Sequence, residues 1–207
     1  MSQSDKPRLP EAEVDALFVT RWSPRAFSDK PLSSEELDTL FEAARWAPSC
    51  FNEQPWLFLY ARNAEDKALF TDLLSEGNRV WAARAPVIAF AVARRHFGRN
   101  GKPNRWAAFD TGAAWMSLSL AAHQRGLITH AMGGFDQARA YEVLRLPPSA
   151  FEILAAIAIG HTGDPADLDA ALREREAPSP RNALDSIRRE GVFDGGDPDV
   201  PGSGPTQ

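Results

Sequence analysis

The densest signal in this 207-residue chain lies in residues 21–27, RWSPRAF, and residues 47–56, APSCFNEQPW. The first places Arg21, Ser23 and Arg25 within five residues. Guanidinium groups bind anions through planar, paired hydrogen bonds, although arginine pairs are also common in solvated surface turns. The second stretch combines proline with serine, asparagine and glutamine, whose side chains can pair with the edge of a polar heterocycle or satisfy an ordinary turn.

A helix is predicted between these two stretches. Ser33 and Glu36 form a capping box, and an apolar stripe at helical spacing follows until Pro48 stops the helix. Helix and strand signals alternate along the remaining chain. Strands are predicted at residues 56–60, 87–93, 127–132 and 152–159, and helices at residues 11–20, around 69–74, at 106–125, after residue 136 and from residue 164.

These elements predict an α+β sandwich, in which helices surround a small central sheet. The stretch 106–125 is apolar nearly all round and ends at Gly126, so we expect a central helix that is buried on most sides. Residues 1–193 are expected to form one domain. Residues 194–207 have almost no apolar side chains, which predicts a disordered tail.

Composition excludes several classes of function. The chain has 23 basic and 28 acidic residues, and the net charge of −5 argues against a general nucleic-acid binder. One cysteine excludes an intrachain disulfide framework, and no Cys/His spacing resembles a zinc site. The first residues lack the pattern of a secretory signal, and no apolar run approaches a membrane span. A cytoplasmic protein without membrane partners is expected.

The two opening stretches, about 22 residues apart on either side of a capped helix, match the patterns R-x-S-x-R-x-F and A-P-S-x-x-N-x-Q-P-W. In this order they resemble the nitroreductase family. The match extends to Gly133 and Gly134 after an apolar strand and to Arg181 near the C-terminus. The resemblance implies an intertwined homodimer with FMN at each of two subunit interfaces. It also implies alternating oxidation of NADH or NADPH and reduction of small electron-poor acceptors, such as nitroaromatics or quinones, by a ping-pong mechanism.

The resemblance also implies residue roles. Arg21 and Ser23 would hold the FMN phosphate and ribityl hydroxyls, Arg25 would lie by the pyrimidine edge, and Arg181 would bind phosphate. Pro48, Cys50 and Asn52 match positions that approach the flavin from the other subunit, while Gly133 and Gly134 would bring backbone amides close to ring N5. Asn78 would touch the ribityl chain. The complete implied cofactor site is Arg21, Trp22, Ser23, Arg25, Pro48, Ser49, Cys50, Asn52, Gln54, Asn78, Gly133, Gly134 and Arg181.

The chain departs from the family pattern at two positions. Cys50 stands where a second small hydroxyl residue is often found, and it is expected to pack against the flavin because no histidine neighbours it in sequence. Ser179 stands where some members carry a phosphate-binding lysine, so a base such as Arg175 is a candidate substitute. Phe51, Trp56 and Phe135 are candidates for selecting flat acceptors.

Two other functions stay open from the sequence. One is an ene- or aldehyde-type flavin reductase, which the family also accommodates. The other is a protein that binds or sequesters FMN without turnover. The resemblance by itself identifies no physiological acceptor.

Overall fold

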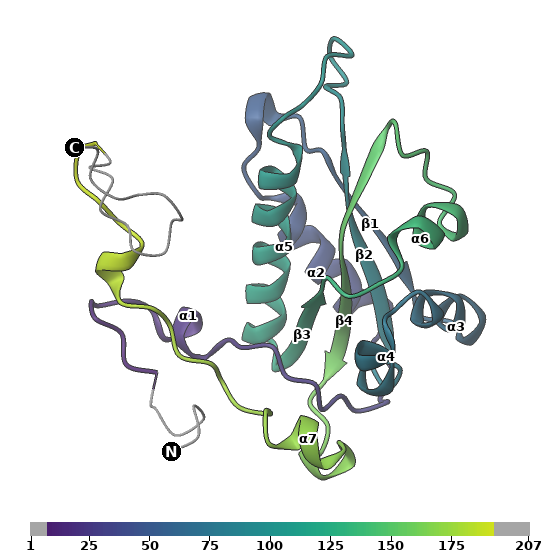
Figure 1. Cartoon of the computed structure of the whole chain (residues 1–207), viewed down its shortest axis with the longest axis vertical. Coiled ribbons are helices and arrows are strands. Elements are labelled where there is room, and N and C mark those ends of the chain that lie inside the picture. The colour runs from purple at the N-terminus through teal and green to yellow at the C-terminus, as the bar shows by residue number, and fades with distance from the viewer. Residues whose placement is uncertain (1–7, 193–207) are drawn as a thin grey trace, which may run out of the picture.

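A four-stranded antiparallel sheet forms the centre of the computed structural model, which describes residues 8–192. The strands are β1 (Trp56–Ala61), β2 (Val87–Arg94), β3 (Leu127–Met132) and β4 (Phe151–His161), in the spatial order β1-β2-β4-β3 (Figure 1). A register shift between Ala91 and Val92 interrupts the pairing of β2 with β4. All four predicted strands are confirmed, and the predicted tail at 194–207 lies outside the described residues.

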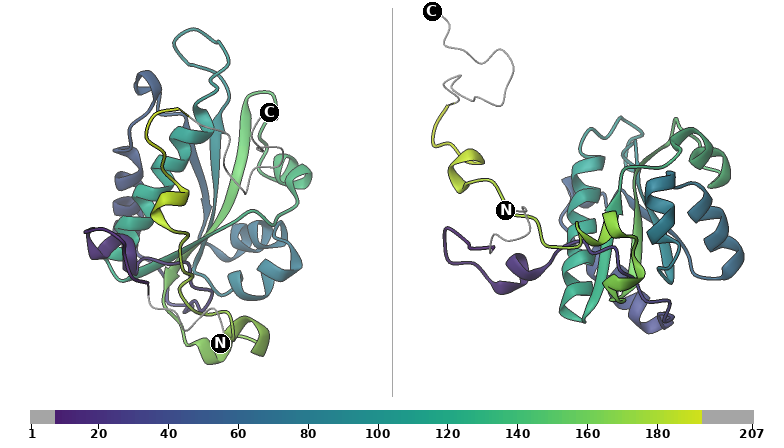
Figure 2. Two further views of the ribbon diagram at one scale, coloured as in Figure 1. Left: turned by 60° about the vertical axis from the view of Figure 1, so that its left-hand side comes forward. Right: turned by 60° about the horizontal axis from the view of Figure 1, so that its bottom comes forward.

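Helices cover both faces of this sheet, as the α+β prediction required (Figures 1 and 2). On one face lie α2 (Ser34–Arg45) and α5 (Ala107–Gln124), and on the other lie α3 (Ala64–Asp72), α4 (Glu76–Ala82) and α6 (Gln137–Val143). Strand β2 serves both layers because successive side chains point to opposite faces. Ile88 and Phe90 join the core under α4 and α6, whereas Val87 and Ala89 join the core under α2 and α5.

The capping box at α2 is present as predicted, with the Ser33 hydroxyl accepting from the Glu36 N–H and the Glu36 carboxylate accepting from the Ser33 N–H. The other helices differ from the prediction in detail. Helix α1 spans only Ala16–Thr20, because the Asp15 side chain caps it by accepting from the Leu17 N–H. The helix predicted from residue 164 is instead a 3-10 turn, Pro165–Asp167, and a separate short helix, α7 (Ala170–Arg173), because Leu168 between them is extended.

Helix α5 is only partly buried in the single chain. Its inner face packs on α2 and the sheet, but Phe109, Gly112 and Met116 form an apolar stripe at helical spacing that is exposed. The side chains of Phe109 and Met116 are 76% and 39% exposed. The prediction that this helix is buried on most sides is therefore wrong for one chain, because the fold supplies no element to cover this stripe among residues 8–192.

The two ends of the described chain run together beside the sheet and helices. We call residues 8–20 and 178–192 the terminal arm; both segments lie apart from the sheet in Figures 1 and 2. The Leu184 N–H donates to the Glu11 carboxylate at 3.0 Å, which joins the two segments. Leu9, Phe18 and Ile187 are exposed on the arm. Several exposed apolar side chains on one protruding segment are typical of an interface.

Candidate functional site

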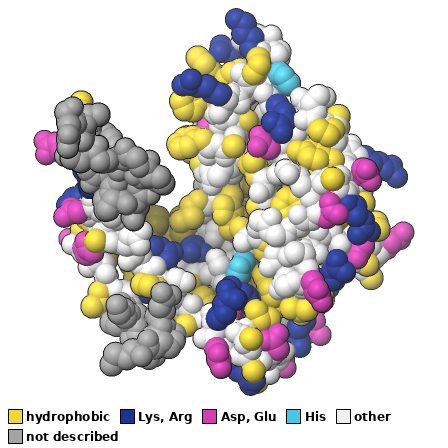
Figure 3. Space-filling view, in the orientation of Figure 1, with side chains coloured by type: hydrophobic (Ala, Val, Ile, Leu, Met, Phe, Trp, Pro, Cys, Tyr) yellow, Lys and Arg dark blue, Asp and Glu magenta, His cyan; other side chains and the backbone are white. Residues whose placement is uncertain are grey.

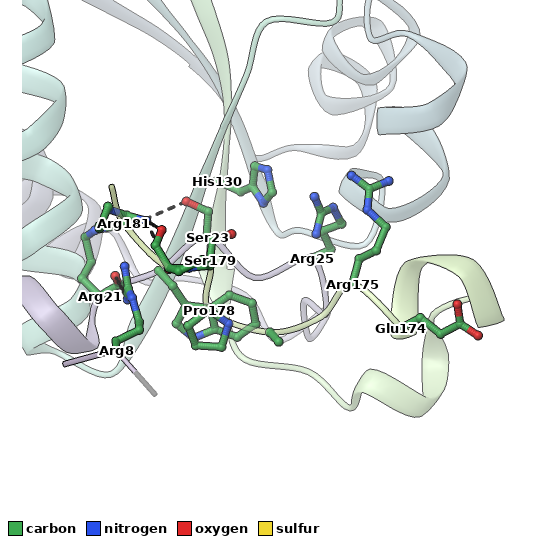
Figure 4. A pocket seen from close by; sticks show the side chains of 13 residues that line it. Arg8, Arg21, Ser23, Arg25, His130, Glu174, Arg175, Pro178, Ser179 and Arg181 are labelled. Atoms are coloured by element: carbon green, nitrogen blue, oxygen red, sulfur yellow. Dashed lines mark hydrogen bonds between the residues drawn. The ribbon is translucent and has the colours of Figure 1, made fainter. Parts of the chain in front are cut away.

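A cavity of about 430 Å³ lies where the 21–27 segment, β3 and the C-terminal segment meet (Figures 3 and 4). Its lining residues are Arg8, Arg21, Trp22, Ser23, Arg25, His130, Glu174, Arg175, Ala177, Pro178, Ser179, Pro180 and Arg181. Five of the predicted site residues, Arg21, Trp22, Ser23, Arg25 and Arg181, thus lie together. The structure also adds Arg8, which precedes the motif by 13 residues and carries no sequence signal of its own.

The 21–27 segment is held in place by residues that follow β4. Phe27 pairs with Thr162 in an isolated bridge, the Ser28 N–H donates to the His161 carbonyl at 3.0 Å, and the Gly163 N–H donates to the Ala26 carbonyl at 2.7 Å. A Cβ on Gly163 would lie 2.5 Å from the backbone of Phe27, so only glycine permits this approach. Phe27 is buried and stacks on Trp81 at 6.1 Å. The motif is therefore anchored to the core directly beside the cavity.

Glu176 fixes the middle of the same segment. One oxygen of its carboxylate accepts from the N–H groups of Arg25 and Ala26 at 2.7 and 2.8 Å, and the other lies 3.8 Å from the Arg25 guanidinium. The Glu176 side chain is 3% exposed. This carboxylate joins the C-terminal segment to the motif and fixes the position of the Arg25 backbone. Sequence reasoning missed Glu176 because it stands in an ordinary charge run, REREA at 173–177.

Three guanidinium groups, those of Arg8, Arg21 and Arg181, gather on one side of the cavity (Figure 4). Burial lowers the pKa of Arg21, and repulsion from Arg8 and Arg181 lowers that pKa further. Burial and then Arg181 likewise lower the pKa of Arg8. Within residues 8–192, none of the three forms an ion pair with a carboxylate. Cations held together without a counter-charge are what an anion site requires.

The orientation of these three side chains is set by backbone carbonyls and one hydroxyl. Arg8 donates to the carbonyls of Val19 and Arg21 at 2.6 and 2.9 Å. Arg21 donates to the Ser23 hydroxyl at 3.4 Å, and Arg181 donates to the carbonyls of Ser179 and Pro180 at 3.2 and 3.0 Å. These partners are neutral, so the positive charge of the cluster is not cancelled.

Arg25 and Arg175 lie on the other side of the cavity, while Glu174 points away from it (Figure 4). Burial is the largest cause lowering the pKa of Arg25; Arg175 also lowers it, and Glu176 raises it. Arg175, the candidate substitute for the absent lysine, therefore lines the same cavity as Ser179, but it neighbours Arg25 and not Arg21.

His130 on β3 is the histidine among the residues that line the cavity. Its Nδ1 lies 2.9 Å from the Pro24 carbonyl, and its ring packs on Trp81 at 4.6 Å. Burial lowers the pKa of His130, and the contact with the Pro24 carbonyl opposes that shift only in part. The imidazole is therefore neutral near pH 7 and positions the Pro24 backbone.

Gly134, two residues after the end of β3, contacts Asn78 of α4. The Asn78 side chain donates to the Gly134 carbonyl at 2.9 Å, and the Ser75 N–H donates to the same carbonyl at 3.0 Å. A Cβ on Gly134 would lie 2.7 Å from the Asn78 amide nitrogen, whereas Gly133 has open space around it. Asn78 belongs to α4, a helix that the sequence analysis did not anticipate. Neither glycine lines the cationic cavity.

The 48–54 segment lies at the opposite end of α5. Its 3-10 turn, Cys50–Asn52, is tied to the first turn of α5 because the Cys50 N–H donates to the Asp110 carboxylate at 3.0 Å. Ser49 accepts from the Gln54 N–H at 3.0 Å, and the Gln54 amide donates to Asn52. Three residues here adopt positive φ, namely Phe51, Asn52 and Gln54. This conformation costs Phe51 and Gln54 about 1–2 kcal/mol each, whereas asparagine adopts it more readily, and strain of this kind concentrates at functional segments.

The two predicted groups of site residues are thus far apart within one chain. Thr20, next to Arg21, contacts His123 in the last turn of α5 at 2.8 Å, while Cys50 contacts Asp110 in the first turn. Thirteen residues of helix separate these two contacts, which corresponds to roughly 20 Å at 1.5 Å per residue. Pro48, Ser49, Cys50, Asn52 and Gln54 therefore do not reach the cavity of their own chain.

The place of Phe135, the grouping of metal-ligating side chains and the hydropathy of the helices also bear on the kind of site. Phe135, a candidate for contacting flat acceptors, is partly buried and packs at the edge of the core, with its ring 5.4 Å from that of Phe90. Across residues 8–192, the structure has no cluster of three or more metal-ligating side chains, and none of the helices in this range has the length and hydropathy to cross a membrane.

An antiparallel sheet between two helical layers, with a basic cavity at one end and a strained segment at the other, defines an α+β sandwich class. Residues 19–161 match the model of the nitroreductase family. The chain belongs to the nitroreductase family.

Known relatives agree with this assignment. A Streptomyces coelicolor protein provisionally named NADH dehydrogenase/NAD(P)H nitroreductase is 30% identical over 182 residues, covering 79% of this chain and 90% of that protein. A crystal structure described as an oxidoreductase containing FMN is 45% identical with a TM-score of 0.86, covering 90% of this chain and 96% of the other. A Desulfovibrio desulfuricans protein provisionally named nitroreductase, solved with FMN, is 26% identical with a TM-score of 0.68, covering 86% and 96%.

Proposed function

We propose that this protein is an FMN-dependent oxidoreductase that takes electrons from NADH or NADPH and reduces small electron-poor organic molecules. The observation that carries this proposal is the cluster of Arg8, Arg21 and Arg181, which has no carboxylate partner among residues 8–192. Relatives that contain FMN and relatives named as NAD(P)H nitroreductases support the same function. A single domain at residues 1–193 and a cytoplasmic location are part of the proposal.

The residues of the cavity fit a phosphorylated flavin. Arg8, Arg21 and Arg181 supply uncompensated positive charge for a phosphate, and the Ser23 hydroxyl beside Arg21 supplies a polar contact for a neighbouring hydroxyl. On the other side, the Arg25 and Arg175 guanidinium groups offer hydrogen-bond donors for the polar edge of a heterocycle, and Glu176 offsets part of the charge of Arg25. Trp22 adds an aromatic wall.

Bound FMN would accept two electrons from the nicotinamide donor and pass them to the acceptor, so the protein itself needs no nucleophile or metal for this chemistry. The residues of the chain bind the cofactor and keep the surrounding backbone in position. The arginines hold the phosphate, Glu176 fixes the Arg25 backbone, and neutral His130 holds Pro24 in place. We propose that donor and acceptor use one position in turn, which is a ping-pong scheme.

A homodimer with a shared site is part of this proposal. Cys50 and Asn52 lie at the far end of α5 from Arg21, so in our proposal they act on the flavin held by a second copy of the chain. The exposed stripe of α5 and the apolar terminal arm are the surfaces that would form the interface between two copies of the chain. Such intertwined interfaces exceed the ordinary buried area of about 1,600 Å².

One assay separates this function from the alternatives. Purified protein is expected to be yellow, to release FMN and not FAD on denaturation, and to oxidise NADH or NADPH continuously when a nitroaromatic is supplied. Bleaching without turnover would favour the FMN-sequestering alternative, and turnover with an α,β-unsaturated carbonyl compound but no nitroaromatic would favour the ene-reductase alternative. Release of FAD, or failure to take up flavin, would refute the proposal.

Arg21→Ala is expected to weaken FMN binding by about 1.5 to 3 kcal/mol, the usual contribution of a hydrogen bond to a charged group. The measurement is fluorescence titration of the apoprotein with FMN. Because the variant changes the affinity for FMN and not the electron transfer through bound FMN, a saturating concentration of FMN should restore its rate of NADPH oxidation. A variant that stays slow at full occupancy would show that Arg21 has another role.

Arg25→Ala is expected to lower the reduction potential of bound FMN, because the electron-rich reduced ring loses a nearby positive charge. Arg175 remains, so we expect a shift on the order of 30 to 60 mV, about 1.4 to 2.8 kcal/mol for a two-electron couple. Redox titration of the fully loaded variant measures the shift, with fully loaded Arg21→Ala as the control. An equal shift in both variants would contradict the separate roles of the two arginines.

A further inference from the structure

The loop that joins β2 to α5 is an ordered hairpin at the same end of the molecule as the 48–54 segment. The Phe97 N–H donates to the Lys102 carbonyl at 2.9 Å, and the Asn104 N–H donates to the Arg95 carbonyl at 2.7 Å. His96 and Pro103 pair between these two bonds, and Gly101 makes the turn at φ 69°. The hairpin is therefore a defined structure that projects from the sheet (Figure 1).

This hairpin is strongly basic in an acidic protein. Residues 94–105 contain five arginines and lysines and no acidic residue, although the net charge of the chain is −5. Arg95 pairs with Glu152 at 3.3 Å, and Arg94 donates to the Trp56 carbonyl. Arg99 and Lys102 at the tip are exposed and form no ion pair with any carboxylate in the 8–192 range. These two charges are available to an anionic ligand.

Contacts join the tip directly to the strained 48–54 segment. The Arg99 guanidinium lies over the ring of Phe51 at 3.8 Å and near the ring of Phe97 at 5.3 Å, and the two rings meet edge to face at 6.2 Å. Glu53 accepts a hydrogen bond from the Gly98 N–H. Phe51 stands between Cys50 and Asn52, the residues that we assign to the second subunit's flavin. The basic tip is therefore held against the segment that, in our proposal, reaches the flavin of the second subunit.

We propose that Arg99 and Lys102 bind the phosphate groups of the nicotinamide dinucleotide donor, an inference that rests on the proposed function. The donor carries at least two phosphate charges that take no part in hydride transfer, and a complementary cation pair beside the segment assigned to the flavin raises both encounter rate and affinity. Stacking on Phe51 and Phe97 keeps the Arg99 guanidinium oriented, which lowers the entropy lost on binding. Uncharged acceptors gain nothing from these residues.

The test uses the full-length, FMN-loaded protein and the double variant Arg99→Gln, Lys102→Gln. A matched control, Lys30→Gln with Arg62→Gln, removes two exposed cations outside the hairpin, since Lys30 precedes α2 and Arg62 directly follows β1. Calorimetric titration with NADP+, which cannot reduce the flavin, gives affinity without turnover. Anaerobic stopped-flow reduction by NADPH, and by 1-benzyl-1,4-dihydronicotinamide, which has no phosphate, gives the dependence on donor concentration.

We expect the double variant to bind NADP+ about tenfold more weakly than the control variant, with a shallower dependence on salt. The loss of second-order rate with NADPH should exceed any loss with the benzyl donor by about the same factor. Equal affinity for NADP+ in the double and control variants, or equal losses with both donors, would overturn the assignment while leaving the proposed function intact. A wild-type protein that neither donor reduces would instead refute the proposed function, and the assignment with it.

Discussion

Replacing Met116 with glutamate is expected to convert the protein into monomers that no longer retain FMN. Met116 lies in the exposed apolar stripe of α5 with Phe109 and Gly112. In a two-fold symmetric interface each substitution counts twice, and burying an unpaired carboxylate costs several kcal/mol. The segments that carry Arg21 and Cys50 contact opposite ends of α5, so separation of the subunits would also divide the proposed flavin site.

Light scattering measures the expected fall in mass from twice the chain mass to 22.7 kDa, and absorbance at the flavin band measures the loss of FMN. Leu69→Glu is the matched control, because Leu69 is also exposed but lies on α3, on the other face of the sheet. The control should remain dimeric and yellow. A Met116→Glu protein with the wild-type mass would show that this stripe is not the interface, and a yellow monomer would show that one chain suffices to hold FMN.

Glu176→Ala is expected to lower the free energy of unfolding by about 3 kcal/mol, which corresponds to a fall in Tm of roughly 6 to 12 °C. The carboxylate is almost completely buried and accepts from the Arg25 and Ala26 N–H groups. Alanine leaves both donors without their partner and removes the counter-charge of Arg25. The C-terminal segment that carries Arg181 also loses its link to the motif, so FMN affinity should fall as well.

Thermal unfolding of the apoprotein isolates the effect on stability from the effect of bound flavin. Glu174→Ala provides the comparison, since Glu174 is exposed and points away from the cavity (Figure 4). Glu176→Gln should lie between wild type and alanine, because an amide oxygen can still accept from the backbone. If Glu176→Ala and Glu174→Ala melt together at the wild-type temperature, Glu176 does not anchor the motif.

Most secondary structure could be read from the sequence, because the signals that set it are local. The capping box of α2 joins residues three apart, and the four strands are short apolar runs that alternate or stay buried over a few residues. Helix α4 was missed because Gly77 and Asn78 weaken its local signal, whereas buried Trp81 and Ala82 hold it against the core. The boundaries of α1 and α7 depended on single capping side chains.

The family could be recognised from RWSPRAF and APSCFNEQPW, which are contiguous patterns, and the α+β class followed from the order of local helix and strand signals. Which charges share the cavity became clear from the three-dimensional arrangement alone. Arg8 and Glu176 reach the motif across 13 and about 150 residues, and no local pattern encodes such pairings. The structure also decided that α5 keeps the two motifs apart and that Arg99 stacks on Phe51. These features arise from long-range packing, in which each side chain is placed by elements that the sequence order does not bring together.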